Sequence, residues 1–361
     1  MKTSRLYTVL AVVMVAAMLL GACAAKPTPA ATATSAGPTS YPAPTTGSPA
    51  TQANTNPTSY PAPTTGAAAA AVTQPVATVA AASGAITVTD GLNRTVTLTA
   101  PAIRIVSLAA SNTEILYSIG AGSLVVGRDE FSDYPAEAKN LPSVGGSMGK
   151  YDLEAIANLK PDLVLAANIN TPDQVKSLED LKLTVFYLAN PTDINGLYTN
   201  LQTVGKLVGK DAEAATLVDG LKKRYDAVVT AVAAATTKPK VYYELDVTDP
   251  TNPYTAGPGS FVDQLITAAG GQNIGGTMKD TWAQISQEQI ISLNPDVILL
   301  GDSAYGTTPD SVAKRPGWDT LSAVKNNQVF AFDDNTVSRP DARLIDGLEA
   351  MAKLIHPELF K

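Results

Sequence analysis

The chain has 361 residues but only one cysteine and one histidine. With Cys23 as the single cysteine, no disulfide bond can form within the chain. With His356 as the single histidine, a zinc or copper site built from several imidazoles is excluded. The glycine motifs that bind nucleotide phosphates or dinucleotides are also absent. The sequence therefore predicts a protein that is not an enzyme and that holds no cofactor and no metal ion.

Charge is also scarce, because only 16% of the residues are Asp, Glu, Lys or Arg. The formal net charge is −7. Residues 1–22 carry two basic residues and no acidic ones, so the remainder has 24 basic and 33 acidic residues and a net charge of −9. A negatively charged chain repels nucleic acid phosphates, so a nucleic-acid partner is not expected.

The first 22 residues have the features of a secretory signal peptide. Lys2 and Arg5 form a basic start, an apolar run follows over 6–20, and small residues precede Cys23. The apolar run is short for a membrane span. The sequence "LGAC" at 20–23 resembles the lipobox of bacterial lipoproteins, which implies that Cys23 is acylated. We therefore expect an extracytoplasmic protein that is anchored to the membrane by lipid on Cys23.

Residues 23–84 are rich in Ala, Thr, Pro, Ser and Gly, and "PTSYPAPTTG" occurs in them twice, at 38–47 and 57–66. A segment of this composition cannot bury enough apolar surface to offset its chain entropy. The segment is therefore predicted to be a disordered tether between the lipidated cysteine and the folded part.

From residue 85 onward, strand and helix patterns alternate, which predicts an α/β fold. A hairpin is expected over 86–98, and an apolar run at 103–110 leads into Ser111–Glu114, which we interpret as a capping box. A long helix is predicted over 211–236. It separates an N-terminal α/β lobe, residues 85–210, from a C-terminal α/β lobe, residues 237–361.

One motif occurs in both predicted lobes. "DLEAIANLKPDLVLAA" at 152–167 aligns with "SQEQIISLNPDVILLG" at 286–301, and Glu154 then coincides with Glu288. Both glutamates are predicted to lie in the first turn of a helix, where a carboxylate stabilises the helix dipole by roughly 0.3–1 kcal/mol. Dipole stabilisation alone does not require the same position in both lobes.

Ligands of such sheets bind beyond the carboxyl ends of the strands. The loops predicted at those ends carry aromatic, sulfur-containing and polar side chains that suit a large, flat and partly apolar ligand. The candidate ligand-binding residues are Phe131, Met148, Tyr254, Trp282, Asn335 and Arg339.

Several segments together resemble the cobalamin and ferric-siderophore substrate-binding proteins of ABC importers. They are "RIVSLAASNTEILYSIGAG", "FSDYP", "LEAIANLKPDLVLA", "YTAGPGSFVDQLITAAGGQN", "WAQISQEQI" and "VSRPDARLIDGLEAMAKLIHPE", and they extend over about 86–360. The resemblance implies a monomer of two Rossmann-like lobes joined by a single long α-helix, with a ligand cleft between the lobes.

The resemblance also implies roles for individual residues. Phe131 and Trp282 correspond to positions that stack on corrinoids, and 335–339 corresponds to a ligand-contacting loop. Met148 and Asn168 stand where cobalamin binders can carry tryptophans, so cobalamin, a ferric siderophore and haem all remain open as ligands. Glu154 and Glu288 correspond to the glutamates that dock on arginines of the membrane permease.

Two other function classes remain open at this point. The chain could be an enzyme on the same two-lobed scaffold, which a catalytic base in the cleft would indicate. It could instead be a surface-scaffolding lipoprotein, as the Pro- and Thr-rich tether would allow; such a protein would bind none of these chelates.

The proposed anchor can be tested by substituting Cys23→Ser. Because only the acylated thiol is expected to hold the protein at the membrane, the variant should move from the membrane fraction to the soluble fraction. Fractionation and intact-mass measurement check this. Membrane association that persists in the variant, with no acyl mass on the unsubstituted protein, would exclude the anchor.

Overall fold

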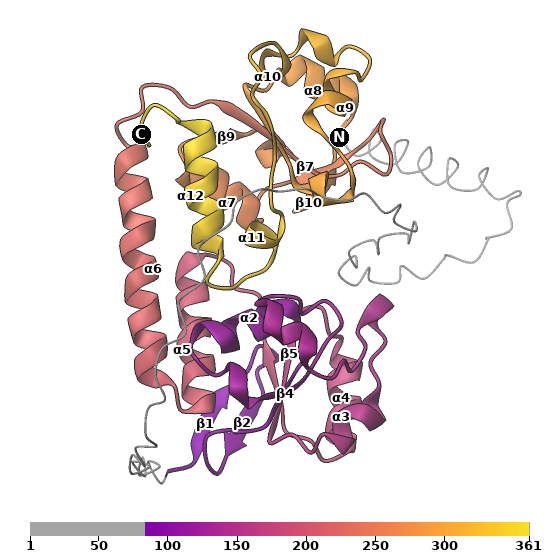
Figure 1. The fold of residues 1–361 in the computed structure, drawn as a ribbon, viewed down its shortest axis with the longest axis vertical. Helices are drawn as coiled ribbons and strands as arrows, with labels where there is room; N and C mark the ends of the chain where they lie inside the picture. Colours follow the sequence, from indigo (N-terminus) through magenta and orange to yellow (C-terminus); the bar gives the residue numbers. More distant parts are fainter. Residues whose placement is uncertain (1–83, 361) are drawn as a thin grey trace, which may run out of the picture. The chain divides into compact units, whose positions relative to one another are not determined.

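The computed structural model describes residues 84–360. The predicted signal peptide, Cys23 and the predicted tether up to residue 83 lie outside these residues. The described residues all belong to one compact unit. They form an α/β fold of two lobes, drawn in indigo to magenta and in orange to yellow in Figure 1.

The N-terminal lobe begins with the predicted hairpin, which is confirmed. Strand β1 (Ile86–Thr89) pairs antiparallel with β2 (Thr95–Leu98). The carboxylate of Asp90 closes the turn, because it accepts hydrogen bonds from the backbone N–H groups of Leu92 and Arg94 at 3.0 and 2.9 Å.

Four parallel strands form the sheet of this lobe, in the order β4-β3-β5-β6. Their bounds are β3 (Ile105–Ser107), β4 (Val125–Arg128), β5 (Leu163–Ala167) and β6 (Val185–Leu188). Every residue of β3, β5 and β6 is buried, as expected for parallel strands covered on both faces. Helices α2 (Ala110–Ser118) and α5 (Ile194–Val208) contribute to one apolar core, and α3 (Leu153–Asn158) and α4 (Pro172–Asp180) contribute to a second.

The predicted capping box at Ser111–Glu114 is wrong. Helix α2 begins at Ala110, and its N-cap residue, Ala109, makes no side-chain cap. Glu114 is buried and forms ion pairs with two distant arginines instead of turning back to the helix start. By contrast, Asp152 caps α3 as predicted, accepting a hydrogen bond from the backbone N–H of Ala155 at 2.9 Å.

Helix α5 of the N-terminal lobe leads into α6 (Asp211–Val232), the long helix that connects the lobes. Helix α5 ends at Gly209, which has a φ of 68° and provides the left-handed C-cap that glycine favours. Helix α6 then runs for 22 residues, about 33 Å at 1.5 Å per residue. It ends four residues before the predicted boundary at 236. Figure 1 shows α6 alongside α5 at one end and α12 (Leu344–Ile355) at the other.

The C-terminal lobe contains a mixed sheet in the order β10-β8-β7-β11-β12, with β9 paired to β7. Strands β7, β9, β11 and β12 are parallel, and β8 pairs antiparallel with both β7 and β10. The strand bounds are β7 (Lys240–Asp246), β8 (Tyr254–Ala256), β9 (Gln272–Asn273), β10 (Trp282–Gln284), β11 (Val297–Leu300) and β12 (Val329–Ala331). The helix bounds are α7 (Phe261–Ala268), α8 (Gln287–Leu293), α9 (Pro309–Ala313), α10 (Ser322–Lys325) and α11 (Asn335–Ser338).

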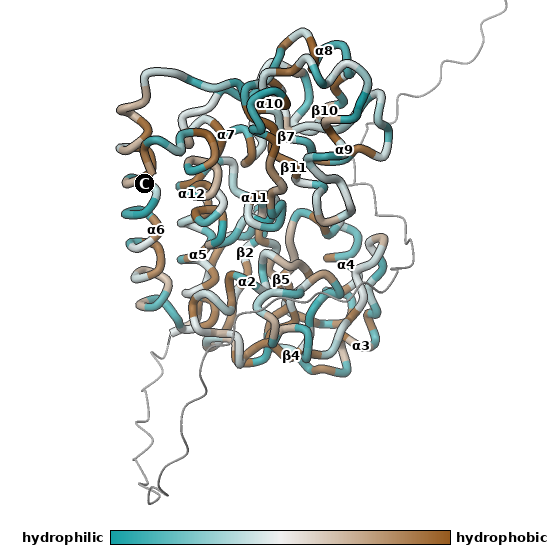
Figure 2. The backbone as a smooth tube through the Cα atoms, turned by 45° about the horizontal axis from the view of Figure 1, so that its top comes forward, coloured by the Kyte–Doolittle hydropathy of each residue, from teal (hydrophilic) through white to brown (hydrophobic). Residues whose placement is uncertain are grey.

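One apolar core extends through both lobes. It joins the α2 and α5 face of the first sheet to α6, and α6 to the α7 and α12 face of the second sheet. Two smaller cores lie on the outer faces of the sheets, the second of them around the fully buried Trp318. Figure 2 shows apolar segments, coloured brown, on helices and strands that contribute to these cores. The two lobes therefore share a packed interior.

Alanine substitutions at two glycines should change the free energy of unfolding in opposite directions. At Gly257 an added Cβ would lie 1.9 Å from the Asp280 carbonyl oxygen, whereas at Gly220, inside α6, it would meet nothing within 4 Å. Gly257→Ala should lower the free energy of unfolding by about 1–3 kcal/mol through overpacking. Gly220→Ala should raise it by about 0.5–1 kcal/mol, because alanine favours helix over glycine. Urea unfolding measures both, and shifts of the same sign would contradict the packing described.

Candidate functional site

The predicted N-terminal candidates, Phe131 and Met148, lie in two adjoining loops. Phe131 follows β4 and is 41% exposed, and Met148 precedes α3 and is 74% exposed. The backbone N–H of Glu130 donates to the Gly145 carbonyl oxygen at 2.8 Å, which joins the loops. Large exposed apolar side chains in adjoining loops form a surface that suits an apolar ligand.

The backbone of the Met148 loop is held in an unusual conformation. Gly145, Gly146 and Gly149 have φ values of 88°, 120° and 71°, and Met148 itself has a φ of 51°. These values lie in the left-handed region that glycine tolerates best. The Gln174 side chain of α4 donates a hydrogen bond to the Gly149 carbonyl oxygen. The loop therefore presents the Met148 side chain from a braced backbone.

Asn168, the other position related to corrinoid binding, lies in the exposed loop after β5. Its side-chain oxygen accepts a hydrogen bond from the backbone N–H of Asn190 at 2.9 Å. Asn168 therefore joins the loops that follow β5 and β6.

Two of the C-terminal candidates, Tyr254 and Trp282, lie on neighbouring strands. In the pairing of β8 with β10, Trp282 is opposite Ala256 and Tyr254 is opposite Gln284. Opposite residues and alternate residues share a face of a sheet, so the Tyr254 and Trp282 side chains project from the same face. Trp282 is 38% exposed and Tyr254 is half-buried.

Arg339 lies at the junction between the lobes rather than in an open loop. Its side chain is 17% exposed, and its Nη1 donates at 2.7 Å both to Glu114 Oε1 of α2 and to Asp133 Oδ1 of the loop after β4. Partial burial would raise the pKa of Asp133, but the hydrogen bond and charge of Arg339 outweigh it and lower the pKa. The carboxyl edges of the two sheets therefore face each other here.

Arg343 completes this cluster. Its Nε donates to Glu114 Oε2, and its guanidinium lies 4.1 Å from the centre of the Tyr134 ring. Burial, followed by the charge of Glu114 and a hydrogen bond with it, raises the pKa of Asp341 well above its usual value. Asn335, the remaining candidate, is half-buried at the start of α11, and its Nδ2 donates to Asp333 Oδ1 at 3.1 Å.

A second buried polar cluster lies at the carboxyl ends of β7 and β11. Arg315 Nη2 donates to Glu244 Oε1 at 2.8 Å, and the guanidinium lies 4.6 Å from the centre of the Trp318 ring. Burial and the charge of Glu244 raise the pKa of Asp302 to about 7. Asp302 Oδ2 accepts a hydrogen bond from Thr307 Oγ1 at 2.8 Å. These contacts brace the loop that follows β11.

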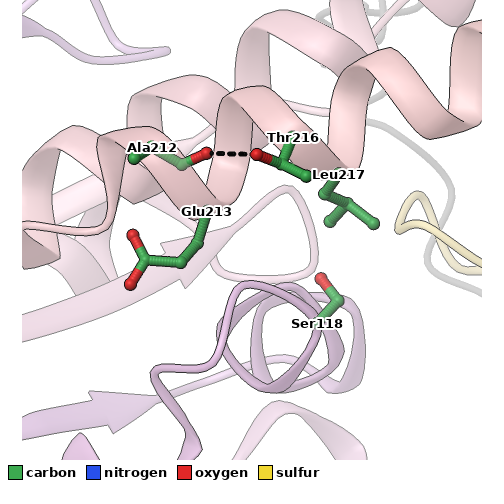
Figure 3. A pocket seen from close by; sticks show the side chains of 5 residues that line it. All are labelled: Ser118, Ala212, Glu213, Thr216 and Leu217. Atoms are coloured by element: carbon green, nitrogen blue, oxygen red, sulfur yellow. Dashed lines mark hydrogen bonds between the residues drawn. The ribbon is translucent and has the colours of Figure 1, made fainter.

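Among the described residues, one surface hollow lies away from the candidate site and another lies near it. The one in Figure 3, of about 440 Å³, lies between the end of α2 and the start of α6 and contains none of the predicted site residues. The other, of about 420 Å³, lies next to Met148 at the end of β3. Its lining residues are Leu108, Gly149, Lys150, Tyr151, Leu153, Gln174, Ser177 and Leu178. Only the second hollow adjoins the candidate site.

A catalytic interpretation of the Met148 loop has no support. "GGSMG" at 145–149 has the Gly-x-Ser-x-Gly spacing of a serine nucleophile, but Ser147 lies in a 3₁₀ turn and not between a strand and a helix. The single histidine, His356, lies in the other lobe and contacts Glu358 and the Gly270 carbonyl oxygen. Residues 84–360 contain no group of three His, Cys, Asp or Glu residues that could hold a metal ion.

The two repeated glutamates occupy equivalent positions in the two lobes. Glu154 is the second residue of α3, and Glu288 is the second residue of α8. Both are exposed, and each helix is already capped, by Asp152 and by Ser286. Within the described range neither glutamate has a hydrogen-bond or ion-pair partner. No helix in this part of the chain is long and apolar enough to cross a membrane.

Several residues of the site were not predicted from the sequence. Glu114, Asp133, Arg343 and Asp341 form the cluster around Arg339. Glu114 lies in the helix sequence "ASNTEILYS", and its unfavourable position next to apolar residues was the available signal. Tyr305 and Ile169 are large exposed apolar residues in loops that follow β11 and β5, and their place after buried strands could have indicated them.

Known proteins are similar to this chain in sequence and in fold. The family model described as periplasmic binding protein matches residues 105–336. The Bacillus subtilis protein named as the uncharacterized ABC transporter substrate-binding lipoprotein YvrC is 31% identical over 279 residues, which cover 76% of this chain and 87% of the relative. A cobalamin-binding protein of Halobacterium salinarum is 32% identical over 283 residues, which cover 76% of this chain and 75% of the relative.

A solved structure agrees with these relatives. The crystal structure of a possible iron-binding (periplasmic solute-binding) protein from Staphylococcus epidermidis superposes with a TM-score of 0.62 at 30% identity. The match covers 71% of this chain and 99% of that protein. Since the family model covers more than half of the chain and the fold agrees, the chain belongs to the periplasmic binding protein family.

Proposed function

We propose that the protein is the substrate-binding component of an ABC importer and that it captures a corrinoid. The observation that carries the proposal is the set of exposed apolar side chains, Phe131, Met148 and Trp282, in a periplasmic binding protein fold. Aromatic faces favour stacking on a flat conjugated ring system. The relative from Halobacterium, which is named for cobalamin binding, supports a corrinoid as the ligand.

The charge balance at the lobe junction favours a neutral ligand. The charges of Arg339 and Arg343 are matched by those of Glu114 and Asp133. A haem would bring two carboxylates and find no uncompensated arginine in this cluster. The amide side chains of a corrinoid carry no charge and need only hydrogen bonds.

An iron chelate is the alternative ligand, because the structural relative from Staphylococcus is described as possibly iron-binding. Transport rather than catalysis is supported by the name of the Bacillus relative, a substrate-binding lipoprotein of an ABC transporter. The same name supports a lipid anchor on Cys23, and we propose that the protein acts as an anchored extracytoplasmic monomer.

Ligand identity can be tested by titrating the purified protein with cyanocobalamin, cobinamide, haem and a ferric siderophore while tryptophan fluorescence is measured. The corrinoids should bind. Trp282→Ala and Phe131→Ala should each weaken binding by roughly 1–3 kcal/mol, which is about 5- to 150-fold in Kd, because a stacking surface is lost. Tyr117→Phe, outside the proposed site, serves as a control. Tighter binding of haem than of either corrinoid would contradict the proposal.

We also propose that Glu154 and Glu288 dock the protein on its permease. The support is their equivalent, exposed and unpartnered positions on two lobes that share one packed core. A fixed separation between two carboxylates can be recognised by a partner that carries arginines at the same separation. Exposed ion pairs contribute little affinity individually, but they set the orientation of a complex.

Charge reversal tests the docking surface. The double variant Glu154→Lys and Glu288→Lys should abolish ligand uptake and permease-stimulated ATP hydrolysis while leaving Kd for the ligand unchanged, because the ligand site is separate. The matched control is Asp219→Lys with Asp226→Lys, which reverses two exposed carboxylates of α6. Thermal unfolding of both variants accounts for lost helix-dipole stabilisation. Normal uptake by the first variant would leave only the dipole role for these glutamates.

A further inference from the structure

Glu114 is a carboxylate in an apolar setting. It is 3% exposed on helix α2, between Thr113 and Ile115, which are also buried. Burying a charge costs several kcal/mol unless opposite charges and hydrogen bonds compensate. Its ion-pair partners come from residues more than 200 positions later in the chain, in the other lobe. The position of Glu114 is therefore tied to the position of that lobe.

The two oxygens of Glu114 are each taken by a different arginine. Oε1 accepts from Arg339 Nη1 at 2.7 Å, and Oε2 accepts from Arg343 Nε. Arg339 follows α11 and Arg343 is the N-cap residue of α12, so the contacts fix both elements against α2. Charged hydrogen bonds of this kind are about twice as strong as neutral ones and are directional.

Glu114 itself is held in place by its own lobe. Asn112 Nδ2 donates to the Leu165 carbonyl oxygen of β5 at 3.0 Å, and Thr113 Oγ1 donates to Ser107 Oγ of β3 at 2.8 Å. Helix α2 is therefore attached to the two central strands of the first sheet. The carboxylate lies on a rigid element, which is what precise positioning of another side chain requires.

Glu114 contacts only one nitrogen of the Arg339 guanidinium. Only Nη1 of Arg339 is engaged, by Glu114 and Asp133, and within residues 84–360 its Nε and Nη2 have no hydrogen-bond partner. The neighbouring Arg343 is held on its other side by the Tyr134 ring. An arginine fixed through one nitrogen can present its remaining N–H groups to an acceptor at little further entropic cost.

We infer that Glu114 is a positioning residue for ligand capture. By holding Arg339 and Arg343, it keeps the carboxyl edges of the two lobes at one separation and orients the remaining N–H groups of Arg339 toward an acceptor oxygen of the ligand. The ligand part of this inference rests on the proposed corrinoid function, whereas the part about lobe separation does not.

Lobe separation is measured by double electron–electron resonance in a Cys23→Ser background. Spin labels go on exposed positions of the two lobes, Lys176→Cys on α4 and Asp310→Cys on α9. The labelled protein should give one narrow distance distribution. Glu114→Gln keeps the side-chain volume but removes the charge, and should broaden or shift the distribution. Glu349→Gln, which removes the surface ion pair with Arg224, is the matched control and should not.

Ligand capture is measured with cyanocobalamin on the same variants. Glu114→Gln should weaken binding at least about tenfold, as expected when a partner of a buried charge pair is removed, and Glu349→Gln should not. If Glu114→Gln fails to fold, Glu114→Asp replaces it in both experiments. This variant keeps the charge on a shorter side chain, so it should shift the distance distribution and weaken cyanocobalamin binding relative to the unsubstituted protein.

The two measurements separate the two proposals. If the unsubstituted protein binds no corrinoid, the proposed function fails, and the distance distributions alone decide the inference. An unchanged distribution in a folded Glu114 variant overturns the role in lobe separation. A changed distribution with unchanged cyanocobalamin affinity overturns the role in orienting Arg339.

Discussion

The apolar core that runs through both lobes is the constraint on which the rest of the structure depends. Helix α6 contributes Val218, Leu221 and Val228 to this core, and α12 contributes Leu348 and Met351. Protein interiors are packed like organic crystals, so a large displacement of one lobe against the other would open voids around these helices. The loops at the carboxyl edges of the two sheets therefore have defined positions relative to each other, although they belong to distant parts of the chain.

Buried ion pairs support these loops in both lobes. The Glu114 cluster lies at the junction of the lobes, and the Glu244 and Arg315 pair lies under the loop that follows β11. A buried ion pair adds little stability compared with apolar packing, because desolvation offsets much of its attraction. Its directional hydrogen bonds do fix the geometry of the side chains around it. These clusters therefore fix the positions of side chains and loops more than they add to the free energy of unfolding.

Much of the fold could be predicted from the sequence because its signals are local. Fully buried parallel strands appear as short apolar runs, and Asp152 and Gly209 mark a helix start and a helix end by their own chemistry. Strands β8 and β10 were not predicted, because each has only three residues and shows no periodicity. A strand-end loop indicated Phe131 as a candidate for the same local reason, whereas Trp282, which was also expected in a loop, is the first residue of β10.

The environment of the candidate site could not be predicted, because its contacts are not local. Glu114 and Arg339 are 225 positions apart, and no pattern around either residue names the other. The sequence suggested a helix cap for Glu114 because a carboxylate three residues after a serine satisfies that motif. Tertiary contacts outweighed the local preference, since two arginines compensate a buried carboxylate better than one backbone N–H group does.

The backbone around Met148 keeps its shape independently of the Met148 side chain. Its shape is set by glycines with positive φ and by a hydrogen bond from Gln174, none of which involves the Met148 side chain. That side chain is largely in solvent, so its replacement changes the surface of the loop at small cost to folding. Substitutions at this position can therefore accumulate over generations without disturbing the scaffold beneath the loop.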